Sequence, residues 1–536
     1  MNDTLRSPDD TPSDAGSPAA DRRIRSLLIA NRGEIALRIA RSARERGIRV
    51  VALRAPDDPW GVPTADAVVE LRGTGPGAFL DPGEIVAAAT AQRCDALHPG
   101  YGFLSERAEL AELCAEQGVR FLGPSPRVLR VFADKLAARR QARDLGVPVL
   151  AATGDGCTLQ EASAFADRSD GPVVIKAVHG GGGRGMRLVS DEDRRDPERF
   201  AALWRRCASE AAGAFGDDAL YVERSIERAR HIEIQIVGDG ERVVALGERD
   251  CTLQRRHQKI VEIAPSPDLS PALRERLTDD AVRLAASVGY AGLGTFEFLV
   301  DCASRDPDSG ASRGYAFIEA NPRLQVEHTI TEEVCGLDLV QLQLAIGEGR
   351  SLDEVGLQSP PRIHGFAIQS RICAETFDAD GRLQPGGGTV RRLTTPLGPG
   401  VRLDTHLAAG AEVSPSFDPL VAKLVVHARG ADGDFTAALR KWGAALAETE
   451  VDGVVTNPGF LRPVADLLGG DPERFARQAT TTWIDRELAA QWGSRQGAIE
   501  ANRPQPEAEE SAEAVCTQDA ARRRRAGATL GSDDPL

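Results

Sequence analysis

The sequence predicts an α/β (α+β) chain that begins with a parallel sheet and ends in a mostly β region. Residues 26–53 (SLLIANRGEIALRIARSARERGIRVVAL) predict strand, helix and strand, the βαβ unit typical of a parallel sheet. After Pro360 the chain changes to short apolar strands separated by Gly/Pro turns. Between these regions lie two strands that carry acidic residues, 294–300 and 315–328.

Length and charge limit the function classes. A chain of 536 residues is long enough for about three domains. Its formal charge of −15 argues against nucleic-acid and acidic-membrane binding. No apolar run approaches the roughly 20 residues that span a bilayer. Residues 1–22 are rich in Asp, Ser and Pro and lack the apolar core of a signal peptide.

Cysteine and lysine usage add two expectations. The nine cysteines form no CxxC pair, which favours reduced thiols in a cytoplasm and makes a zinc site improbable. Only five of the 65 basic residues are lysines, and we expect these to serve where a compact ammonium is needed, as in phosphate contact. They are Lys135, Lys176, Lys259, Lys423 and Lys441.

The N-terminal alternation of strand and helix extends to about residue 124. Strands are expected at 67–71, 94–100 and 119–124, with helices around 84–90 and 105–117. Asn31-Arg32-Gly33 lacks the GxGxxG spacing, so a dinucleotide fingerprint is absent. The segment HPGYGFLSE follows a strand, where ligand loops often lie, although by itself it is most simply an ordinary turn.

A strand with Lys176 leads directly into a glycine loop. Residues 171–190 (GPVVIKAVHGGGGRGMRLVS) predict a strand, four glycines and a returning strand. Glycines let backbone N–H groups approach a phosphate, and Lys176 would meet the same charge. The alternative is a flexible hairpin, and the P-loop is excluded because GK[ST] is absent. Lys135 lies in a basic helix whose default interpretation is a solvated face.

Two further segments carry polar residues on strands. Residues 219–240 predict a strand with Glu223 and a second strand led by His231, a pair that would suit adenine and ribose or be purely structural. Residues 247–267 place a run of donors between two apolar strands, which suits an oxyanion or forms a solvated loop. The run is Arg255, Arg256, His257, Gln258 and Lys259.

The acidic strands predict a metal site. In YAFIEANPRLQVEH, residues 315–328, polar and apolar side chains alternate, as in one extended strand. Its polar face holds Glu319, Asn321, Arg323, Gln325 and Glu327. Glu297, in GTFEFLV, would lie beside Glu319 if the two strands form a hairpin. Two adjacent carboxylates need a cation, and carboxylate oxygens are preferred ligands of Mg²⁺.

Seven motifs in one order and spacing resemble the biotin carboxylases of the ATP-grasp superfamily. They are LIANRGEIALRI, HPGYGFLSE, GGGGRGM, RHIEIQI, ERDCTLQRRHQK, GTFEF and FIEANPRLQVEH, and the similarity runs from about Ile24 to about Leu488. The resemblance implies an ATP-grasp fold with a Rossmann-like N-terminal domain (23–133), an ATP-grasp domain (134–350) and a mostly β C-terminal domain (351–490). It also implies a mobile Gly-rich lid at about 150–225. Residues 1–22 and 491–536 are expected to be disordered tails.

The resemblance also implies a role for each matching residue. The residues that would bind ATP are Lys135, Lys176, Glu223, His231 and the loop glycines Gly181, Gly182 and Gly183. His257 and Gln258, in the adjoining donor run, would also belong to the cofactor-binding residues. Glu297, Glu319 and Asn321 would hold Mg²⁺ or Mn²⁺. Lys259, Arg323, Gln325 and Val326 would bind bicarbonate, with Glu327 as general base and Arg371 beside biotin. The family usually has Glu and Asn where this chain has Gln369 and Cys373, so the biotin side departs from the pattern.

The implied reaction is ATP-dependent carboxylation of biotin by bicarbonate through carboxyphosphate. No lysine follows Lys441, and the only methionines are Met1 and Met186, so the usual Met-Lys-Met attachment site for biotin is missing. We therefore expect a separate biotin carboxyl carrier protein, a separate carboxyltransferase subunit and a homodimer. The expected system is an acetyl- or acyl-CoA carboxylase of fatty acid biosynthesis. The alternatives are a pyruvate- or urea-type carboxylase, another ATP-grasp ligase and a non-catalytic nucleotide-binding scaffold.

Overall fold

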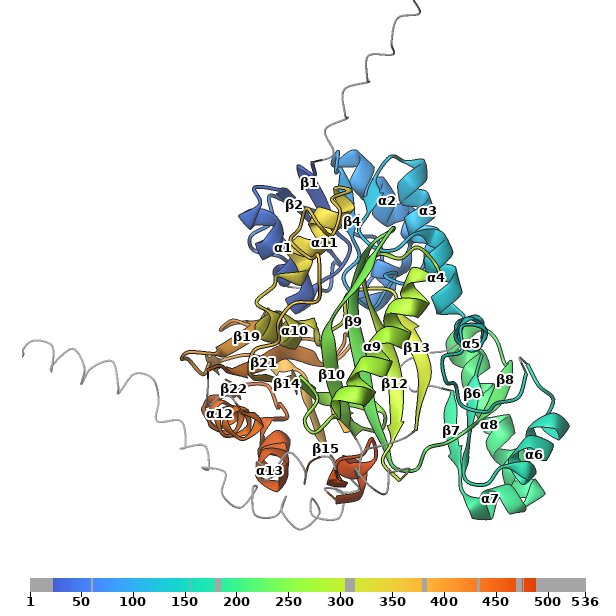
Figure 1. Cartoon of the computed structure of the whole chain (residues 1–536). Helices are drawn as coiled ribbons and strands as arrows, with labels where there is room; N and C mark the ends of the chain where they lie inside the picture. The colour runs from blue at the N-terminus through green and yellow to red at the C-terminus, as the bar shows by residue number, and fades with distance from the viewer. Residues whose placement is uncertain are drawn as a thin grey trace, which may run out of the picture.

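The structure is a computed structural model of the chain (Figure 1). It describes residues 23–58, 61–154, 156–178, 185–303, 314–377, 383–430, 434–468, 475 and 477–487. The expected tails 1–22 and 491–536 lie outside the described residues, as do Gly181, Gly182 and Gly183 of the glycine loop. Within the described part of the chain, no helix has the length and apolar character needed to cross a bilayer.

Five parallel strands form the N-terminal sheet, in the order β3-β2-β1-β4-β5 (blue in Figure 1). The strands are β1 (Ser26–Ile29), β2 (Arg49–Arg54), β3 (Ala67–Glu70), β4 (Ala96–His98) and β5 (Arg120–Phe121), with helices α1 (Gly33–Glu45), η1 (Gly75–Leu80), α2 (Pro82–Ala91) and α3 (Ala108–Glu116). On β1, Leu27 and Ile29 pack in one core and Leu28 in another, because helices cover both faces of the sheet. The predicted βαβ unit is confirmed.

Two helices, α4 (Pro126–Ala133) and α5 (Lys135–Asp144), connect this sheet to the middle of the chain. The expected basic helix around Lys135 is interrupted at Asp134. The Asp134 carboxylate accepts hydrogen bonds from the backbone N–H groups of Leu136 and Ala137, so it caps α5. Lys135 is therefore the first residue of α5.

A small three-stranded antiparallel sheet, in the order β7-β6-β8, carries Lys176 and Glu223 (Figure 1). Its strands are β6 (Val173–Ala177), β7 (Met186–Val189) and β8 (Leu220–Arg224), and helices α6 (Leu159–Arg168), α7 (Asp191–Arg195) and α8 (Pro197–Phe215) accompany them. The predicted strand with Lys176 and the returning strand after the glycine loop are confirmed, since Lys176 lies opposite Met186.

An eight-stranded antiparallel sheet forms the centre, in the order β13-β12-β9-β10-β11-β14-β21-β19. Its strands are β9 (Ala229–Asp239), β10 (Val243–Arg255), β11 (Gln258–Ala264), β12 (Ala291–Asp301), β13 (Tyr315–Asn321), β14 (Phe366–Cys373), β19 (Val401–Thr405) and β21 (Leu420–Ala428). Helix α9 (Pro271–Ala286) packs on β9 and β10. Because β11 pairs with β14, one sheet joins the middle of the chain to its C-terminal region.

The structure corrects two sequence-based predictions. The strands that hold Glu223 and His231 are not a pair: β8 pairs with β6, whereas β9 pairs with β10 and β12 of the central sheet. Residues 315–328 are not one extended strand either, because β13 ends at Asn321 and α10 (His328–Cys335) begins seven residues later. Pro322 has no N–H to continue the ladder, so the chain turns back there.

The C-terminal region is mostly β, as predicted. Its short strands are β15 (Glu375–Phe377), β16 (Leu383–Pro385), β17 (Gly388–Thr389), β18 (Arg392–Thr394), β20 (Glu412–Val413) and β22 (Glu450–Asp452), and its helices are α12 (Phe435–Glu448) and α13 (Pro458–Leu468), with α11 (Leu339–Gly347) before it. Trp442 of α12 is fully buried in this core and donates to Ser370 Oγ at 3.1 Å.

Gly238→Ala is expected to destabilise the protein by about 1–3 kcal/mol. Gly238 lies in β9 between two neighbouring strands, and a Cβ there would come within 2.1 Å of the Tyr290 carbonyl oxygen. Gly443→Ala in α12 is the control, because a Cβ at this position meets nothing within 4 Å. It should stabilise the helix by about 0.5–1 kcal/mol. Urea unfolding of both variants tests the pair, and unchanged stability of Gly238→Ala would contradict the packing described.

Candidate active site

Three acidic residues lie side by side on adjacent strands of the central sheet. Glu297 of β12 is in register with Glu319 of β13 on one side and with Glu233 of β9 on the other. The predicted hairpin and the proximity of Glu297 to Glu319 are therefore confirmed. Asn321 donates its amide N–H to Glu297 Oε1 at 2.7 Å. Glu233 and Glu297 are buried and Glu319 is partly exposed, and carboxylates this close require cations around them.

Lys259, from the start of β11, supplies one of these cations. Its Nζ donates to Glu233 Oε2 at 2.6 Å, Glu297 Oε1 at 3.0 Å and Glu327 Oε1 at 2.8 Å. Burial lowers the pKa of Lys259, but Glu233, Glu297 and Glu327 outweigh it, so the pKa lies well above its ordinary value. Lys259 is thus a charged ammonium held among three carboxylates.

The loop between β13 and α10 brings the remaining predicted anion-binding residues to the same place. Gln325 donates to Glu297 Oε1 at 3.1 Å. Arg323 donates through Nη2 to Asn321 Oδ1 at 3.1 Å and pairs through Nε with Glu106. Glu106 comes from the HPGYGFLSE segment, so this loop of the N-terminal domain forms one wall of the site.

Glu327 and Arg371 form the far end of the cluster. Glu327 is fully buried, and its Oε2 accepts from Arg371 Nη2 at 3.1 Å. Burial raises the pKa of Glu327, but Lys259, Arg371 and Arg249 more than offset this, so its pKa lies below the ordinary value. Glu327 is therefore an ionised carboxylate between two cations. It was predicted to lie on the β13 strand and lies instead at the N-cap of α10.

The predicted nucleotide-side lysines each contact an acid. Lys176 Nζ donates to Glu223 Oε2 at 2.8 Å, and Arg139 bonds the other oxygen of the same carboxylate. Lys135 Nζ lies 2.8 Å from Glu319 Oε2, which raises the pKa of Lys135 above its ordinary value. Lys135 thereby links α5 to the acidic strands.

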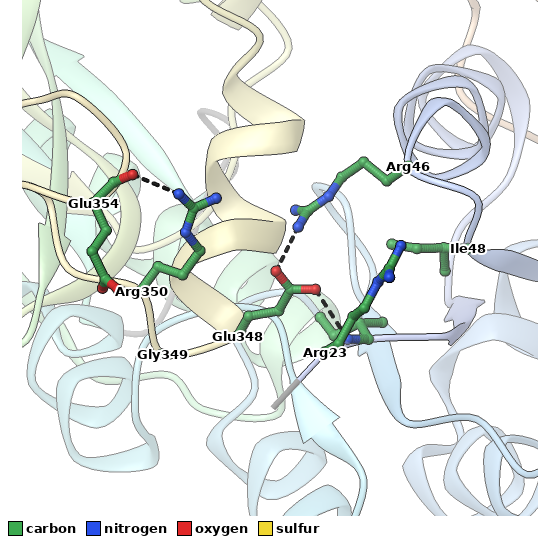
Figure 2. A pocket seen from close by; sticks show the side chains of 8 residues that line it. Arg23, Arg46, Ile48, Glu348, Gly349, Arg350 and Glu354 are labelled. Carbon is green, nitrogen blue, oxygen red and sulfur yellow. Dashed lines mark hydrogen bonds and ion pairs between the residues drawn. The ribbon is translucent and has the colours of Figure 1, made fainter. Parts of the chain in front are cut away.

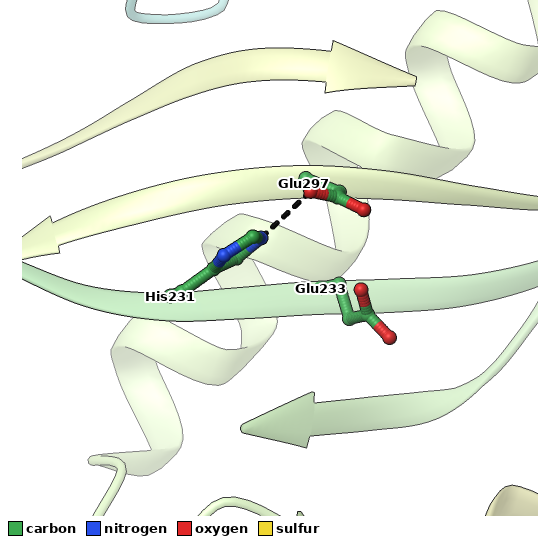
Figure 3. Close-up of side chains that lie close together, drawn as sticks. All are labelled: His231, Glu233 and Glu297. Atoms are coloured by element: carbon green, nitrogen blue, oxygen red, sulfur yellow. Dashed lines mark ion pairs between the residues drawn. The ribbon is translucent and has the colours of Figure 1, made fainter. Parts of the chain in front are cut away.

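His231 lies next to the acidic residues (Figure 3). Its Nε2 is 2.7 Å from Glu297 Oε2, and its Nδ1 is 2.7 Å from Gln254 Nε2. Ligand atoms of His231, Glu233 and Glu297 lie within 4.8 Å of one another, so these three are another set that could hold a metal ion. Mg²⁺ prefers carboxylate oxygens, so the adjacent pair of Glu297 and Glu319 also fits it.

His257 and Gln258 do not join the buried cluster. Both are exposed at the turn between β10 and β11, where Arg256 and His257 have positive φ angles of 48° and 64°. Asp485 holds this turn by accepting from the backbone N–H of Arg256 at 3.0 Å. The neighbouring Lys259 points instead into the cluster, because successive strand residues face opposite sides.

Several residues of the site were missed from the sequence. Glu233 and Glu262 occupy polar positions of strands that alternate with apolar residues, and each is fully buried. Arg249, also fully buried, pairs with Glu233 and donates to Gln235 Oε1 at 2.7 Å. Lys423 donates to the Val326 carbonyl oxygen at 3.2 Å. The scarcity of lysine had set Lys423 apart in the sequence, whereas Glu233, Glu262 and Arg249 carried no local signal of function.

A cavity of about 620 Å³ lies apart from this cluster (Figure 2). Its lining residues are Arg23, Ile24, Arg46, Ile48, Glu348, Gly349, Arg350 and Glu354. Glu348 accepts from the Ile24 backbone N–H at 3.0 Å and pairs with Arg46, so its charge is already neutralised. None of the predicted site residues lines this cavity.

Comparison with protein families finds three matches in chain order. Residues 23–129 match "Biotin carboxylase, N-terminal domain", residues 134–355 match "Carbamoyl-phosphate synthase L chain, ATP binding domain", and residues 369–486 match "Biotin carboxylase C-terminal domain".

Curated relatives of the chain point to the same family. The biotin carboxylase of a Nostoc species is 41% identical over 463 residues, which covers 85% of this chain and 98% of the relative. Human mitochondrial pyruvate carboxylase is 45% identical over 470 residues, covering 86% of this chain but only 38% of the relative. The chain thus spans about two fifths of the length of the pyruvate carboxylases it matches.

Solved structures show the same architecture. The biotin carboxylase–β,γ-ATP complex from Campylobacter jejuni matches with a TM-score of 0.78 and 34% identity, over 87% of this chain and 99% of that one. The biotin carboxylase domain dimer of Hydrogenobacter thermophilus 2-oxoglutarate carboxylase, in complex with MgADP, ADP and bicarbonate, matches with a TM-score of 0.79 and 34% identity, over 87% and 98%.

Proposed function

The chain belongs to the biotin carboxylase family of ATP-grasp ligases, and from this premise we propose how its own residues carry out the reaction. ATP, bicarbonate and biotin react to give ADP, phosphate and carboxybiotin. We assign ATP to the side chains of Lys135, Lys176, Glu223 and His231, and bicarbonate to the group of Lys259, Arg323, Gln325 and the Val326 backbone.

The observation that carries this assignment is the position of Lys259. Its ammonium contacts Glu297, a proposed metal ligand, and Glu327, the proposed base, at 3.0 and 2.8 Å. An anion beside Lys259 would therefore lie close both to the metal-bound phosphates and to a proton acceptor. Proximity of this kind can supply a large part of a rate enhancement.

Glu327 is the proposed general base for bicarbonate. Its carboxylate would take the bicarbonate proton while a bicarbonate oxygen attacks the γ-phosphorus of ATP, which forms carboxyphosphate and releases ADP. The low pKa of Glu327 keeps it ionised, and a bound anion that shares Lys259 and Arg371 would raise its basicity. Lys259 and Arg323 would neutralise the charge of the attacking anion.

We propose that four residues bind ATP. Lys135 and Lys176 would contact its phosphates, and Glu223 and His231 would contact adenine or ribose. The glycine loop, with Gly181, Gly182 and Gly183, would cover the phosphates. Glu297, Glu319 and Asn321 would hold Mg²⁺ or Mn²⁺. The metal ion supplies positive charge that offsets repulsion between bicarbonate and the triphosphate.

Arg371 is proposed to act on the biotin side. Carboxyphosphate can break down to CO₂ and phosphate, and the released phosphate can remove the proton from the ureido nitrogen of biotin. The guanidinium of Arg371 would stabilise the enolate that forms, and the nitrogen then attacks CO₂. The Arg371 carbonyl oxygen accepts from Asn457 Nδ2 at 3.0 Å, which holds this part of β14 in place.

The partners and the final acceptor are also proposals. We propose that biotin is carried on a separate carrier protein, because all five lysines lie in the folded part of the chain and four are in the site. A carboxyltransferase subunit would then carboxylate an acyl-CoA, and the chain would act as a cytoplasmic homodimer. The 45% identity to pyruvate carboxylase supports a second candidate, the biotin carboxylase part of a pyruvate-type system.

Phosphate release from ATP tests the function directly. We expect release to require both bicarbonate and Mg²⁺, to increase when free biotin is added, and to stop with a chelator. Hydrolysis that depends on a different acceptor would identify another ATP-grasp ligase. Nucleotide binding without turnover would identify a scaffold.

A further inference from the structure

A closed series of hydrogen bonds connects Gln369 to Glu327. Thr329 Oγ1 donates to Gln369 Oε1, and Gln369 Nε2 donates to Glu262 Oε2 at 3.0 Å. The other Glu262 oxygen accepts from Arg371 Nε at 2.6 Å, and Arg371 Nη2 reaches Glu327 Oε2 at 3.1 Å. Thr329 follows Glu327 by two residues in the first turn of α10, which closes the series.

The donor and the acceptor of each bond follow from which side-chain atoms carry a proton. Glu262 bonded to Arg371 is an acceptor, so the Gln369 side chain must present its NH₂ to it and its oxygen to the Thr329 hydroxyl. Thr329, Gln369 and Glu262 are each 0% exposed, so water does not replace a missing partner. An amide side chain can donate to Glu262 and accept from Thr329 without taking up a proton.

We propose that Gln369 is a positioning residue that orients Arg371 through Glu262, an inference that rests on the proposed role of Arg371 beside biotin. With both oxygens bonded, the Glu262 carboxylate has one orientation. Arg371 Nε follows that orientation, and its Nη2 is directed to Glu327. The position of the guanidinium is thus set by a side chain that does not touch it.

Replacing Gln369 by Glu makes the proposal sensitive to pH. A carboxylate cannot donate to Glu262, so one of the two acids must carry a proton at a separation of about 3 Å. The titratable and charged groups that face Glu262 are Arg371 and the Cys373 thiol from β14, Glu327 from the loop before α10, Lys259 from its own strand and the Cys251 thiol from β10. Burial already raises the pKa of Glu262 despite Arg371. The shared proton should therefore be lost only as the pH rises above the usual carboxyl range.

The test measures biotin-dependent turnover of three variants of the full chain. Gln369→Met removes both hydrogen bonds and should lower kcat/KM for free biotin about tenfold or more at all pH values, with KM for ATP within about twofold of wild type. Gln369→Glu should be close to wild type near pH 6 and lose activity on the way to about pH 9. Gln343→Met is the control: Gln343 is also buried, donates to the Leu122 carbonyl oxygen at 2.8 Å and should leave the biotin parameters unchanged.

Two results would overturn the proposal. One is an unchanged kcat/KM for biotin in Gln369→Met. The other is an equal loss in all kinetic parameters of both Gln369 variants with no difference in their pH profiles, which would indicate a purely structural role. Wild-type protein without biotin-stimulated turnover would instead refute the proposed function, and the positioning role with it.

Discussion

Glu327→Gln is expected to lower biotin-dependent turnover by about 10²- to 10⁴-fold while ATP binding stays near normal. The amide cannot accept the bicarbonate proton, and it no longer balances Lys259 at 2.8 Å and Arg371 at 3.1 Å. The lysines proposed for ATP phosphates, Lys135 and Lys176, contact Glu319 and Glu223 and are unaffected. Phosphate release measures turnover, and calorimetric titration with MgATP measures binding.

Glu333→Gln is the matched control for this experiment. Glu333 lies on the same helix, α10, but pairs with Arg402 and Arg429 outside the cluster. Its variant should keep wild-type turnover. Wild-type turnover of Glu327→Gln would show that another group takes the bicarbonate proton.

Lys259→Met is expected to abolish bicarbonate-dependent turnover and to reduce the free energy of unfolding by about 3–5 kcal/mol at neutral pH. The change leaves Glu233, Glu297 and Glu327 buried without the ammonium they share. The remaining cations of the cluster, Arg249 and Arg371, contact only Glu233 and Glu327 of the three.

The stability loss of Lys259→Met should depend on pH. In wild type, Lys259 holds the pKa of Glu297 and Glu327 below the ordinary value, although burial acts in the opposite direction. The stability that these acids contribute is present above the ordinary carboxyl pKa and is lost as the pH falls through their folded pKa. In the variant, burial without Lys259 raises the pKa of these carboxyls in the folded state above their value in the unfolded state. The folded variant therefore binds more protons than the unfolded chain and loses stability as the pH increases.

Urea unfolding at about pH 5 and about pH 8 checks this sign, since the gap to wild type should be wider at the higher pH. Lys441→Met is the control. Lys441 donates to the carbonyl oxygens of Pro399 and His427, at 3.0 and 2.7 Å, rather than to carboxylates. Its stability loss should not change over this pH range. A gap for Lys259→Met that narrows with increasing pH would contradict the arrangement of charges.

Local sequence patterns predicted most elements and part of the site. Alternation of apolar and polar residues placed Glu297 and Glu319 on neighbouring strands of a hairpin, and β12 and β13 pair them in register. The same pattern was wrong beyond Asn321, because Pro322 ends the strand and the alternation of the next residues belongs to a turn before α10.

The partners of Lys259 and Arg371 could not be predicted in this way. Arg371 reaches Glu327 from a strand 44 residues further along the chain, and its other partner, Glu262, is 109 residues away. Glu262 and Glu233 gave no local signal of function, since a buried acid and a solvated acid alternate with apolar residues in the same manner.

The sequence by itself determined the N-terminal βαβ unit, the strands on either side of the glycine loop, the acidic hairpin and, through seven motifs in register, membership of the biotin carboxylase family. The tertiary structure alone decided that β8 and β9 belong to different sheets, that Lys259 lies among three carboxylates and that Gln369 is joined to Arg371 through Glu262. The reason is physical: backbone preference and burial are encoded locally, whereas the pairing of distant strands depends on packing of the whole chain.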